Sequence, residues 1–310
     1  MHCYPAENII PLFTYCLDPP CIVGQYMENG TLSSKLLDVN KPLNWSQRAN
    51  IAVGIARGLH HLHANNIFHG DIKGPNILLD KHLEPKIGDF GTARLLYNLS
   101  GNETSKIILP RMPGSPDYLP NWYIEGSKAK VVRTQVDMYS FGMVLLEIMS
   151  GKLSGDKKLK DSYNRTLRNY VDTDIIKQTD PPAEYIAPVD ETNRTFKITI
   201  QDEVDGQVQY SEQSCDWAKL MFDIGRQCTM HNQVPWREPL KDKTPWVTMR
   251  ENGITAKNIH EHLEDCYSYY RMHLDENVQK EVANVDVMQL VERITTGCLK
   301  NQPQNMDTGK

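Results

Sequence analysis

The stretch HGDIKGPNILLD, at residues 69–80, places several polar residues of catalytic type next to an apolar run. It carries Asp71, Lys73 and Asn76, and the motif PKIGDFG that follows it adds Asp89. Transfer of a phosphoryl group from ATP needs a carboxylate to receive a hydroxyl proton, a cation on the γ-phosphate and oxygen ligands for magnesium. The chain supplies each of these residue types in order. The pattern therefore predicts a phosphotransfer site.

Each of these residues alone would be weak evidence, because an isolated Asp or Lys is most often a solvated surface residue. A Lys close to an Asp is likewise most often an exposed ion pair of little energetic value. The local setting strengthens the prediction, because NILLD and PKIGDFG read as two short strands joined by a turn. Four suitable residues on a strand–turn–strand unit are a specific signal.

The flanking segments predict a small sheet followed by helices. IIPLFT (9–14) and CIVGQY (21–26) are apolar runs around a DPP turn, which predicts an antiparallel hairpin. Thr31 is placed to cap a short helix, and apolar residues at helical spacing predict an amphipathic helix over 45–66. TQVDMYSFGMVLLEIMSG (134–151) is apolar nearly all round, so we expect a helix buried in a core.

The rest of the chain is more uneven. Residues 152–213 are polar, but TFKITIQDEVDGQVQY within them alternates around an Asp-Gly turn and predicts a second hairpin. Helical patterns follow at 214–231, 254–272 and 277–296. The last ten residues, NQPQNMDTGK, are of disordered type.

Composition restricts the class of protein. The 310 residues are 40% hydrophobic and 24% charged, which is ordinary for a globular protein. The net charge of −5 argues against nucleic acid as the main partner, because phosphate backbones need a basic surface. The seven cysteines show no metal-binding spacing, and neither a secretory signal nor a transmembrane segment is evident. We therefore expect reduced thiols in a cytoplasmic protein.

HGDIKGPNILLD, KIGDFG, GSPDYLP and DMYSFGMVLLEIMSGK together resemble the catalytic loop, magnesium loop, end of the activation segment and central helix of a eukaryotic protein kinase. The sequences of these motifs are most similar to those of the Pelle and interleukin-1-receptor-associated kinase group, with plant receptor-like kinases next. The resemblance covers about residues 5–270, with an unusual insertion near 155–213. It implies an α+β, protein-kinase-like fold, mainly the helical C-terminal lobe with a remnant of the N-lobe sheet. The implied division is an N-lobe remnant with the hinge at 1–27, the C-lobe at 28–272, and a helix and disordered tail at 273–310.

The resemblance also implies a role for each residue of the predicted site. Asp71 would be the catalytic base, Lys73 would contact the γ-phosphate, and Ser115 would bridge these two side chains. Asn76 and Asp89 would hold a magnesium ion (Mg). On the residues alone, Ser115 also reads as a turn serine before a proline, so both interpretations stay open.

The adenine ring of ATP would lie against a hinge and a floor. By resemblance, the backbones of Gln25 and Met27 would bond the adenine edge, and Leu78 would form the floor under the ring. Asp137 would hold the catalytic-loop backbone from below. On the residues alone, Asp137 is also an ordinary acid in the first turn of a helix, and the two readings are compatible.

The chain departs from the family pattern in three places. Gly70 stands where most kinases have an arginine that pairs with a phosphorylated activation loop, so we expect no such pairing. No glycine-rich loop and no V-A-I-K strand precede residue 69, so the first strands of the small lobe are expected to be missing from this chain. Residues 120–122 read PNW where the family has APE, and its usual Arg-Pro partner is matched only by TP at 244–245.

Two hypotheses follow. The first is a serine/threonine protein kinase of the Pelle-like group in intracellular signalling, represented by an incomplete chain. The second is a pseudokinase, a non-catalytic scaffold or decoy in the same pathway. Both imply protein substrates or signalling adaptors as partners; the oligomeric state does not follow from the sequence, and recruitment to membrane receptor complexes is left open. The hairpin within 9–26 is expected to be sticky unless something covers it.

Overall fold

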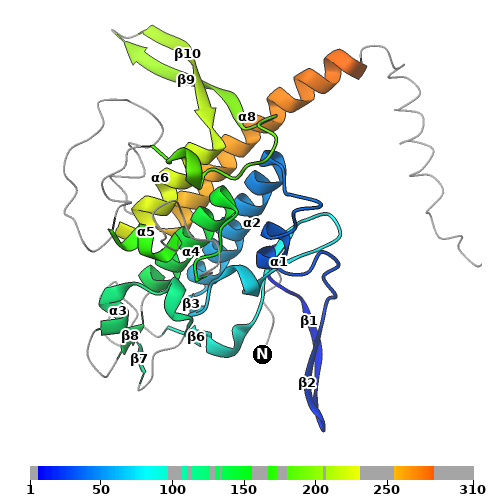
Figure 1. Cartoon of the computed structure of the whole chain (residues 1–310), viewed down its shortest axis with the longest axis vertical. Coiled ribbons are helices and arrows are strands. Elements are labelled where there is room, and N and C mark those ends of the chain that lie inside the picture. Colours follow the sequence, from blue (N-terminus) through cyan, green and yellow to red (C-terminus); the bar gives the residue numbers. More distant parts are fainter. Residues whose placement is uncertain are drawn as a thin grey trace, which may run out of the picture.

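The helical body contains four long helices, one of which is buried between two of the others (Figure 1). The computed structural model describes residues 6–96, 107–109, 114–125, 130–132, 134–155, 167–173, 180–204, 207–230 and 255–282. The long helices are α2 (Trp45–Ala64), α4 (Thr134–Ser150), α6 (Trp217–Met230) and α8 (Ala256–Val282). Short helices are α1 (Leu32–Leu36), α3 (Asn121–Glu125) and α5 (Leu167–Thr173), with 3₁₀ turns η1 (Gly74–Asn76), η2 (Phe90–Thr92), η3 (Pro116–Tyr118) and η5 (Ala183–Tyr185).

The strands form separate antiparallel pairs rather than one continuous sheet. The pairs are β1 (Leu12–Leu17) with β2 (Pro20–Gly24), β3 (Ile67–Phe68) with β6 (Arg94–Leu95), β4 (Ile77–Leu79) with β5 (Pro85–Ile87), β7 (Ile107–Leu109) with β8 (Lys130–Val132), and β9 (Thr195–Val204) with β10 (Gln207–Asp216). Helices with few short strands confirm the α+β fold class with a reduced sheet.

The core is centred on α4. Residues 136–150 of this helix are all buried, as its nearly uniform apolar sequence predicted. α6 crosses α4 at close range, and a Cβ added to Gly142 would lie 2.9 Å from the Gly225 carbonyl oxygen. Glycine at this crossing therefore lets the two helix backbones meet.

The helix predicted over 45–66 is confirmed as α2. The Asn44 side chain accepts a hydrogen bond from the Gln47 amide, and Gln47 in turn accepts from the Asn44 amide. This capping box begins the helix and satisfies two amides that would otherwise lack partners. Thr31 caps α1 in a similar way, by accepting from the Ser34 amide at 3.2 Å, as predicted.

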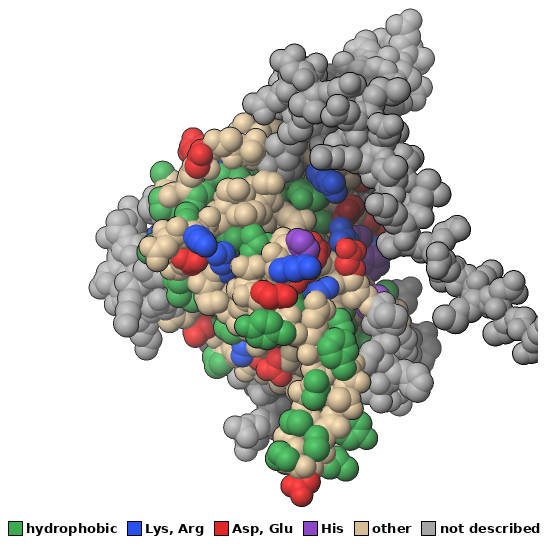
Figure 2. All heavy atoms as spheres, turned by 90° about the vertical axis from the view of Figure 1, so that its right-hand side faces the viewer, with side chains coloured by type: hydrophobic (Ala, Val, Ile, Leu, Met, Phe, Trp, Pro, Cys, Tyr) green, Lys and Arg blue, Asp and Glu red, His purple; other side chains and the backbone are tan. Residues whose placement is uncertain are grey.

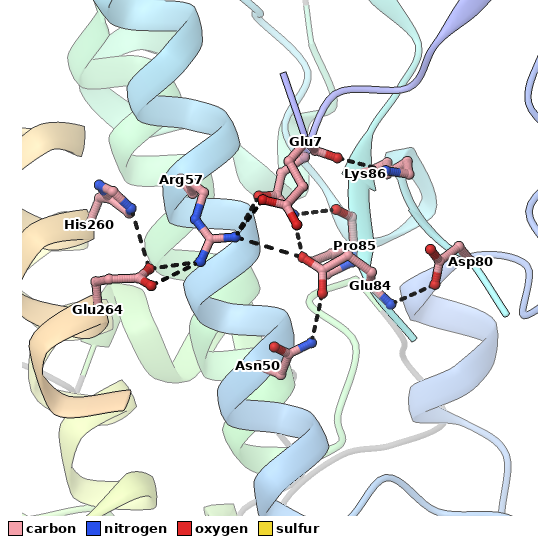
Figure 3. Close-up of polar contacts among 10 residues, drawn as sticks. Glu7, Asn50, Arg57, Asp80, Glu84, Pro85, Lys86, His260 and Glu264 are labelled. Carbon is pink, nitrogen blue, oxygen red and sulfur yellow. Dashed lines mark hydrogen bonds and ion pairs between the residues drawn. The ribbon is translucent and has the colours of Figure 1, made fainter. Parts of the chain in front are cut away.

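Helix α8 lies along α2, held at its surface by a charged cluster (Figure 3). Arg57 of α2 donates to both carboxylate oxygens of Glu264, at 2.8 and 3.1 Å, and its other terminal nitrogen is 3.4 Å from Glu7 and 3.9 Å from Glu84. The helix predicted over 254–272 is thus confirmed, but it continues to Val282. The separate helix expected to begin at residue 277 is wrong at its start, because no glycine or proline interrupts the chain there; residues beyond 282 lie outside the described part.

The predicted N-terminal hairpin is confirmed as β1 and β2, which project from the helical body (Figure 1). Phe13, Tyr15, Leu17 and Ile22 on it are between 68% and 79% exposed, and apolar side chains cover it in Figure 2. Its base is fixed, because Ile10 donates to the Ile87 carbonyl oxygen of β5 at 2.9 Å. In the part of the chain that the structure describes, no other strand pairs with β1 or β2.

Both strands predicted around the polar stretch are confirmed as β4 and β5, and the second hairpin as β9 and β10. The boundaries of the proposed lobes and of the insertion near 155–213 stay predictions. No helix in the described ranges combines the length and the apolar character that crossing a bilayer requires.

Candidate active site

The loop that carries the predicted site is suspended from α4. Asp137, in the first turn of this helix, is 1% exposed at its side chain and accepts hydrogen bonds from the backbone amides of His69 (2.9 Å) and Gly70 (2.8 Å). His63 of α2 also contacts the Asp137 carboxylate, at 3.1 Å. A buried carboxylate with several donors is satisfied, so it can fix the loop firmly. This contact is the one that the resemblance implied.

Three of the predicted catalytic side chains meet in one cluster. Lys73 Nζ lies 2.6 Å from Asp71 Oδ2 and donates to Ser115 Oγ at 2.8 Å. Asn76 Nδ2 donates to the Asp71 carbonyl oxygen at 2.8 Å and to Asp71 Oδ2 at 3.1 Å. Residues 115 and 73 are 42 positions apart, so folding, and not proximity in sequence, brings this serine to the loop.

The two carboxylate oxygens of Asp71 differ in their hydrogen bonding. Its Oδ1 is buried and has no hydrogen-bond partner among the described residues. Burial opposes ionisation of this carboxyl group, but its interactions with Lys73, Ser115 and Asn76 outweigh burial and hold its pKa below the ordinary value. The side chain is therefore ionised at neutral pH, with an acceptor oxygen left for a ligand that carries a hydroxyl group.

Asp89 lies on the neighbouring loop, which is bonded to the first. Gly88 donates to the Asn76 carbonyl oxygen at 2.9 Å, and His69 Nε2 contacts the Gly88 carbonyl oxygen at 3.0 Å. Asp89 itself is exposed, has a left-handed backbone (φ 57°) and accepts from the Gly91 amide at 3.3 Å. These bonds hold the two loops side by side.

The oxygen atoms of Asn76 and Asp89 fit a hard divalent cation. The side-chain nitrogen Nδ2 of Asn76 donates to Asp71, which leaves the side-chain oxygen Oδ1 as the atom available to a metal. Asp89 contributes an exposed carboxylate on the adjoining loop. Magnesium takes oxygen ligands and commonly uses only one or two from the protein, with the rest from water and phosphate.

The predicted adenine-binding residues flank β4. Leu78 lies on this strand, where its Cδ1 is 3.2 Å from the position that a Cβ on Gly88 would take. The segment after the hairpin runs beside the same strand, because Leu79 donates to the Gly30 carbonyl oxygen at 2.8 Å. Gln25 donates its amide to Pro11, and the Met27 carbonyl oxygen accepts from Gly30, both at 3.1 Å. The Gln25 carbonyl and the Met27 amide therefore stay available for an adenine edge, since neither bonds another described backbone group.

Sequence reasoning missed the side chains that hold the segment after Ser115. Three successive backbone carbonyl oxygens each accept from a different side chain: Asp117 from Ser154 Oγ (2.9 Å), Tyr118 from Ser140 Oγ (2.7 Å), and Leu119 from Arg168 Nη1 (2.6 Å). We call these three donors, Ser140, Ser154 and Arg168, the carbonyl clamp. The only sequence signal was Ser140, a hydroxyl within an otherwise apolar helix.

Arg168 makes a second contact with the segment after Ser115. Its second terminal nitrogen donates to Asn121 Oδ1 at 2.7 Å, and its guanidinium carbon lies 5.3 Å from the Tyr139 ring centre. The family pattern would use a glutamate at residue 122 and an arginine near 244–245, but 244–245 lie outside the described residues. Here, an arginine from α5 holds the same segment through its backbone and an amide oxygen.

A buried acid supports the same segment from below. Glu147 Oε1 accepts from the Tyr118 hydroxyl and from the Ser154 amide, both at 2.6 Å, while Oε2 has no partner among the described residues. Burial raises the pKa of Glu147 to about 7, although these two hydrogen bonds lower it. A Cβ on Gly74 would lie 3.1 Å from Glu147 Oε2, so this acid also borders the loop that carries Asn76.

Comparison with known proteins agrees with this geometry. The family model described as "Protein kinase domain" matches residues 1–222. The chain is 45% identical over 154 residues to the Pelle-like serine/threonine-protein kinase pik-1 of Caenorhabditis elegans, covering 47% of this chain and 31% of that protein. It is 39% identical over 158 residues to Protein BRASSINOSTEROID INSENSITIVE 1 of Arabidopsis thaliana, covering 48% of this chain and 13% of that protein.

A third relative is matched over more of its length. The chain is 34% identical over 209 residues to cold-responsive protein kinase 1 of Arabidopsis thaliana, which covers 63% of this chain and 51% of that protein. The chain thus spans about half or less of the length of these three relatives. With the family model matched over most of the chain, and with the predicted loops in place, the chain belongs to the protein kinase family.

Proposed function

We propose that the chain carries the catalytic centre of a serine/threonine protein kinase of the Pelle-like group, which transfers the γ-phosphate of ATP to a protein hydroxyl group. The cluster of Asp71, Lys73, Ser115 and Asn76 is the observation that carries the proposal, because it joins a base, a cation and a metal ligand within hydrogen-bonding distance. The names of the C. elegans and Arabidopsis relatives support the same reading.

In this proposal the protein positions groups and moves one proton. Asp71 Oδ1, which has no partner among the described residues, would orient the substrate hydroxyl group and accept its proton. A low pKa makes Asp71 a weak base, so the proton would transfer only as the new bond to phosphorus develops. Lys73 would exchange part of its ion pair with Asp71 for a contact with the γ-phosphate, and Ser115 would keep both side chains aligned.

Asn76 and Asp89 would hold magnesium, which supplies charge neutralisation on the phosphates. The Gln25 carbonyl and the Met27 amide would bind the adenine edge over Leu78. Protein substrates and signalling adaptors are the proposed partners. A cytoplasmic location, with recruitment to membrane receptor complexes as a further option, completes the proposal.

The alternative is a pseudokinase that acts as a scaffold or decoy. The exposed apolar hairpin formed by β1 and β2 favours it, because such a surface suits a binding partner. The two functions differ in what they require of Asp71. Only catalysis needs its carboxylate, whereas a scaffold needs the surface alone.

The test compares wild type with Asp71→Asn in the protein expressed from its complete reading frame. Phosphate transfer from Mg-ATP to a serine/threonine peptide mixture is expected to fall about 10²–10⁴-fold, the usual contribution of general base catalysis. ATP affinity is expected to stay within about twofold, because Asn keeps the shape of the side chain. Equal transfer by the two proteins, or none by wild type, would refute the kinase proposal.

The 310-residue polypeptide by itself is expected to bind Mg-ATP weakly and to transfer little phosphate. Its adenine-binding segment follows a hairpin that has no other strand beside it in the described chain. Calorimetry with Mg-ATP and a steady-state transfer assay check this expectation. Low-micromolar binding, or steady transfer that depends on Asp71, would contradict it.

A further inference from the structure

Two cysteines face each other across the exposed N-terminal hairpin. In the β1–β2 register, Cys16 pairs directly with Cys21, between the pairs Leu17–Pro20 and Tyr15–Ile22. Directly opposed residues in an antiparallel ribbon place their side chains on the same face. Cys16 and Cys21 therefore project to one side, opposite the face shared by Tyr15 and Ile22.

The geometry of the register suits a disulfide bond. Opposed residues in an antiparallel pair have Cα atoms about 4.5–5.5 Å apart, within the range of about 4.4–6.8 Å seen in disulfides. The closing step therefore needs rotation of the two side chains, with no change of register. Cys16 Sγ now donates to the Asp18 carbonyl oxygen at 3.2 Å, so it must leave this contact with the turn to reach Cys21.

Accessibility separates this pair from the other thiols. Of the five cysteines that the structure describes, only Cys16 and Cys21 are exposed, and none of the five is in a disulfide. Burial raises the pKa of the Cys215 thiol to about 11 and that of the Cys266 thiol to about 12. It also raises the pKa of the fully buried Cys228 thiol. Because the thiolate is the reactive form, those three are protected, and the hairpin is the place where an oxidant reaches paired sulfur atoms.

We propose that Cys16 and Cys21 form a redox-active dithiol, which hydrogen peroxide converts to an intramolecular disulfide across the hairpin. One thiolate attacks a peroxide oxygen, the O–O bond breaks, and a sulfenic acid and hydroxide form. The second thiol then attacks the sulfenic sulfur and displaces its hydroxyl group, which leaves with a proton as water. In sum, two thiols and one peroxide give one disulfide and two waters; sulfur is oxidised, and peroxide oxygen is reduced.

The bond would act on the segment that follows the hairpin. β2 ends at Gly24, and Gln25 then donates to the Pro11 carbonyl oxygen at the base of β1. A covalent link between the strands would hold the register that delivers Gln25 and Met27 to their places beside β4. This consequence rests on the proposed adenine-binding role, whereas the disulfide itself does not.

The experiment treats the reduced 310-residue chain with one equivalent of hydrogen peroxide. All proteins in the experiment carry Cys3→Ser, because cleavage before Asp18 would leave Cys3 on the same fragment as Cys16. The remaining thiols are then blocked under denaturing conditions, and proteolysis before Asp18 separates Cys16 from Cys21. Trypsin would leave the two cysteines in one peptide, because Lys35 is the first lysine or arginine of the chain. We expect the two fragments to be joined until a reductant is added, and the chain to be lighter by two hydrogen atoms.

Variants make the result specific. Cys16→Ser and Cys21→Ser should each abolish the joined fragments, and the remaining thiol should be trapped as sulfenic acid by dimedone. Cys215→Ser is the matched control in the other hairpin and should leave the bond unaffected. Amide hydrogen exchange over 12–24 should slow at least about tenfold on oxidation, with α2 unchanged as an internal reference.

Other outcomes would overturn the proposal. These are two thiols that survive peroxide, a bond formed between two chains, or a bond from Cys16 or Cys21 to Cys215, Cys228, Cys266 or Cys298. Since no nucleotide enters the experiment, its failure would leave the proposed kinase activity untouched. Conversely, a protein without kinase activity could still show the disulfide.

Discussion

Replacing Gly70 with arginine tests how tightly the loop that carries Asp71 is packed. This change would restore the residue that the family pattern places there. Gly70 has a φ of +81°, in the left-handed region that other residues avoid. A Cβ at this position would lie 2.7 Å from Phe68 Cε1 and 3.2 Å from its Cζ, so the aromatic ring fills the space that a side chain would need. We therefore expect Gly70→Arg to destabilise the protein.

The size of the effect follows from these two causes. A non-glycine residue in the left-handed conformation costs about 1–2 kcal/mol. Displacing the buried ring of Phe68 from its packing adds about 1–3 kcal/mol, as is usual for overpacking. A loss of about 3 kcal/mol would lower the melting temperature by roughly 5–10 °C in a chain of this size.

Two matched variants separate the causes. Gly30→Ala measures the backbone cost alone, because Gly30 also has a positive φ (+66°) but its Cβ would meet only Ser34 Oγ, at 3.4 Å. Adding Gly70→Ala to a Phe68→Val background should cost only the backbone part, since the ring is gone. Thermal and urea unfolding of each protein give the values. A Gly70→Arg protein that melts within about 1 °C of wild type would show that this reasoning is wrong.

Three further predictions concern two groups that support the segment after Ser115 and one that joins α2 to α8. The pKa of Glu147 is raised to about 7 from an ordinary 4.5, so the stability that this group contributes is fully present below pH 4.5 and is lost as pH rises through 7. Glu147→Gln should therefore remove about 3 kcal/mol of the pH dependence of the unfolding free energy between pH 5 and 8, measured by urea unfolding. A pH dependence equal to that of wild type would contradict this. Arg168→Met should lower the unfolding free energy by about 1–3 kcal/mol, because it leaves the Leu119 carbonyl oxygen without its hydrogen bond. It should also speed hydrogen exchange over 115–121 more than Arg168→Lys does. Equal exchange in the two variants would argue against the carbonyl clamp. Arg57→Met should cost under about 1 kcal/mol, because the Arg57 side chain is 32% exposed, and the cost should shrink in 1 M salt; a salt-independent cost would point to packing instead.

Local sequence patterns predicted the main elements well. The periodic apolar residues of α2 and the uniform apolar character of α4 depend only on neighbouring residues, as do the Thr31 cap and the two hairpins. The order of Asp71, Lys73 and Asn76 similarly predicted one cluster, because a short loop cannot separate them far. Contacts within a few residues are therefore readable from the chain alone.

Contacts between distant segments were not readable in this way. Arg168 meets Leu119 across 49 positions, and nothing in LRNYVDT distinguishes this arginine from a surface cation. The sequence also presented Gly70 only as a lost arginine. The conformation that makes glycine suitable there depends on Asp137, 67 positions away, which fixes the Gly70 amide.

The residues proposed for catalysis and those proposed for nucleotide binding lie in two different parts of the chain. Among the described residues, the hydrogen bonds that position Asp71, Lys73 and Asn76 come from the loops at 69–91, from Ser115 and from α4, all within or against the helical body. Gln25 and Met27 instead follow a hairpin whose side chains are largely exposed. A change within 12–24 should therefore alter nucleotide affinity and leave the catalytic cluster intact. Tyr15→Ser tests this division: hydrogen exchange over 69–77 should match wild type, and faster exchange there would show that the hairpin also supports the catalytic loop.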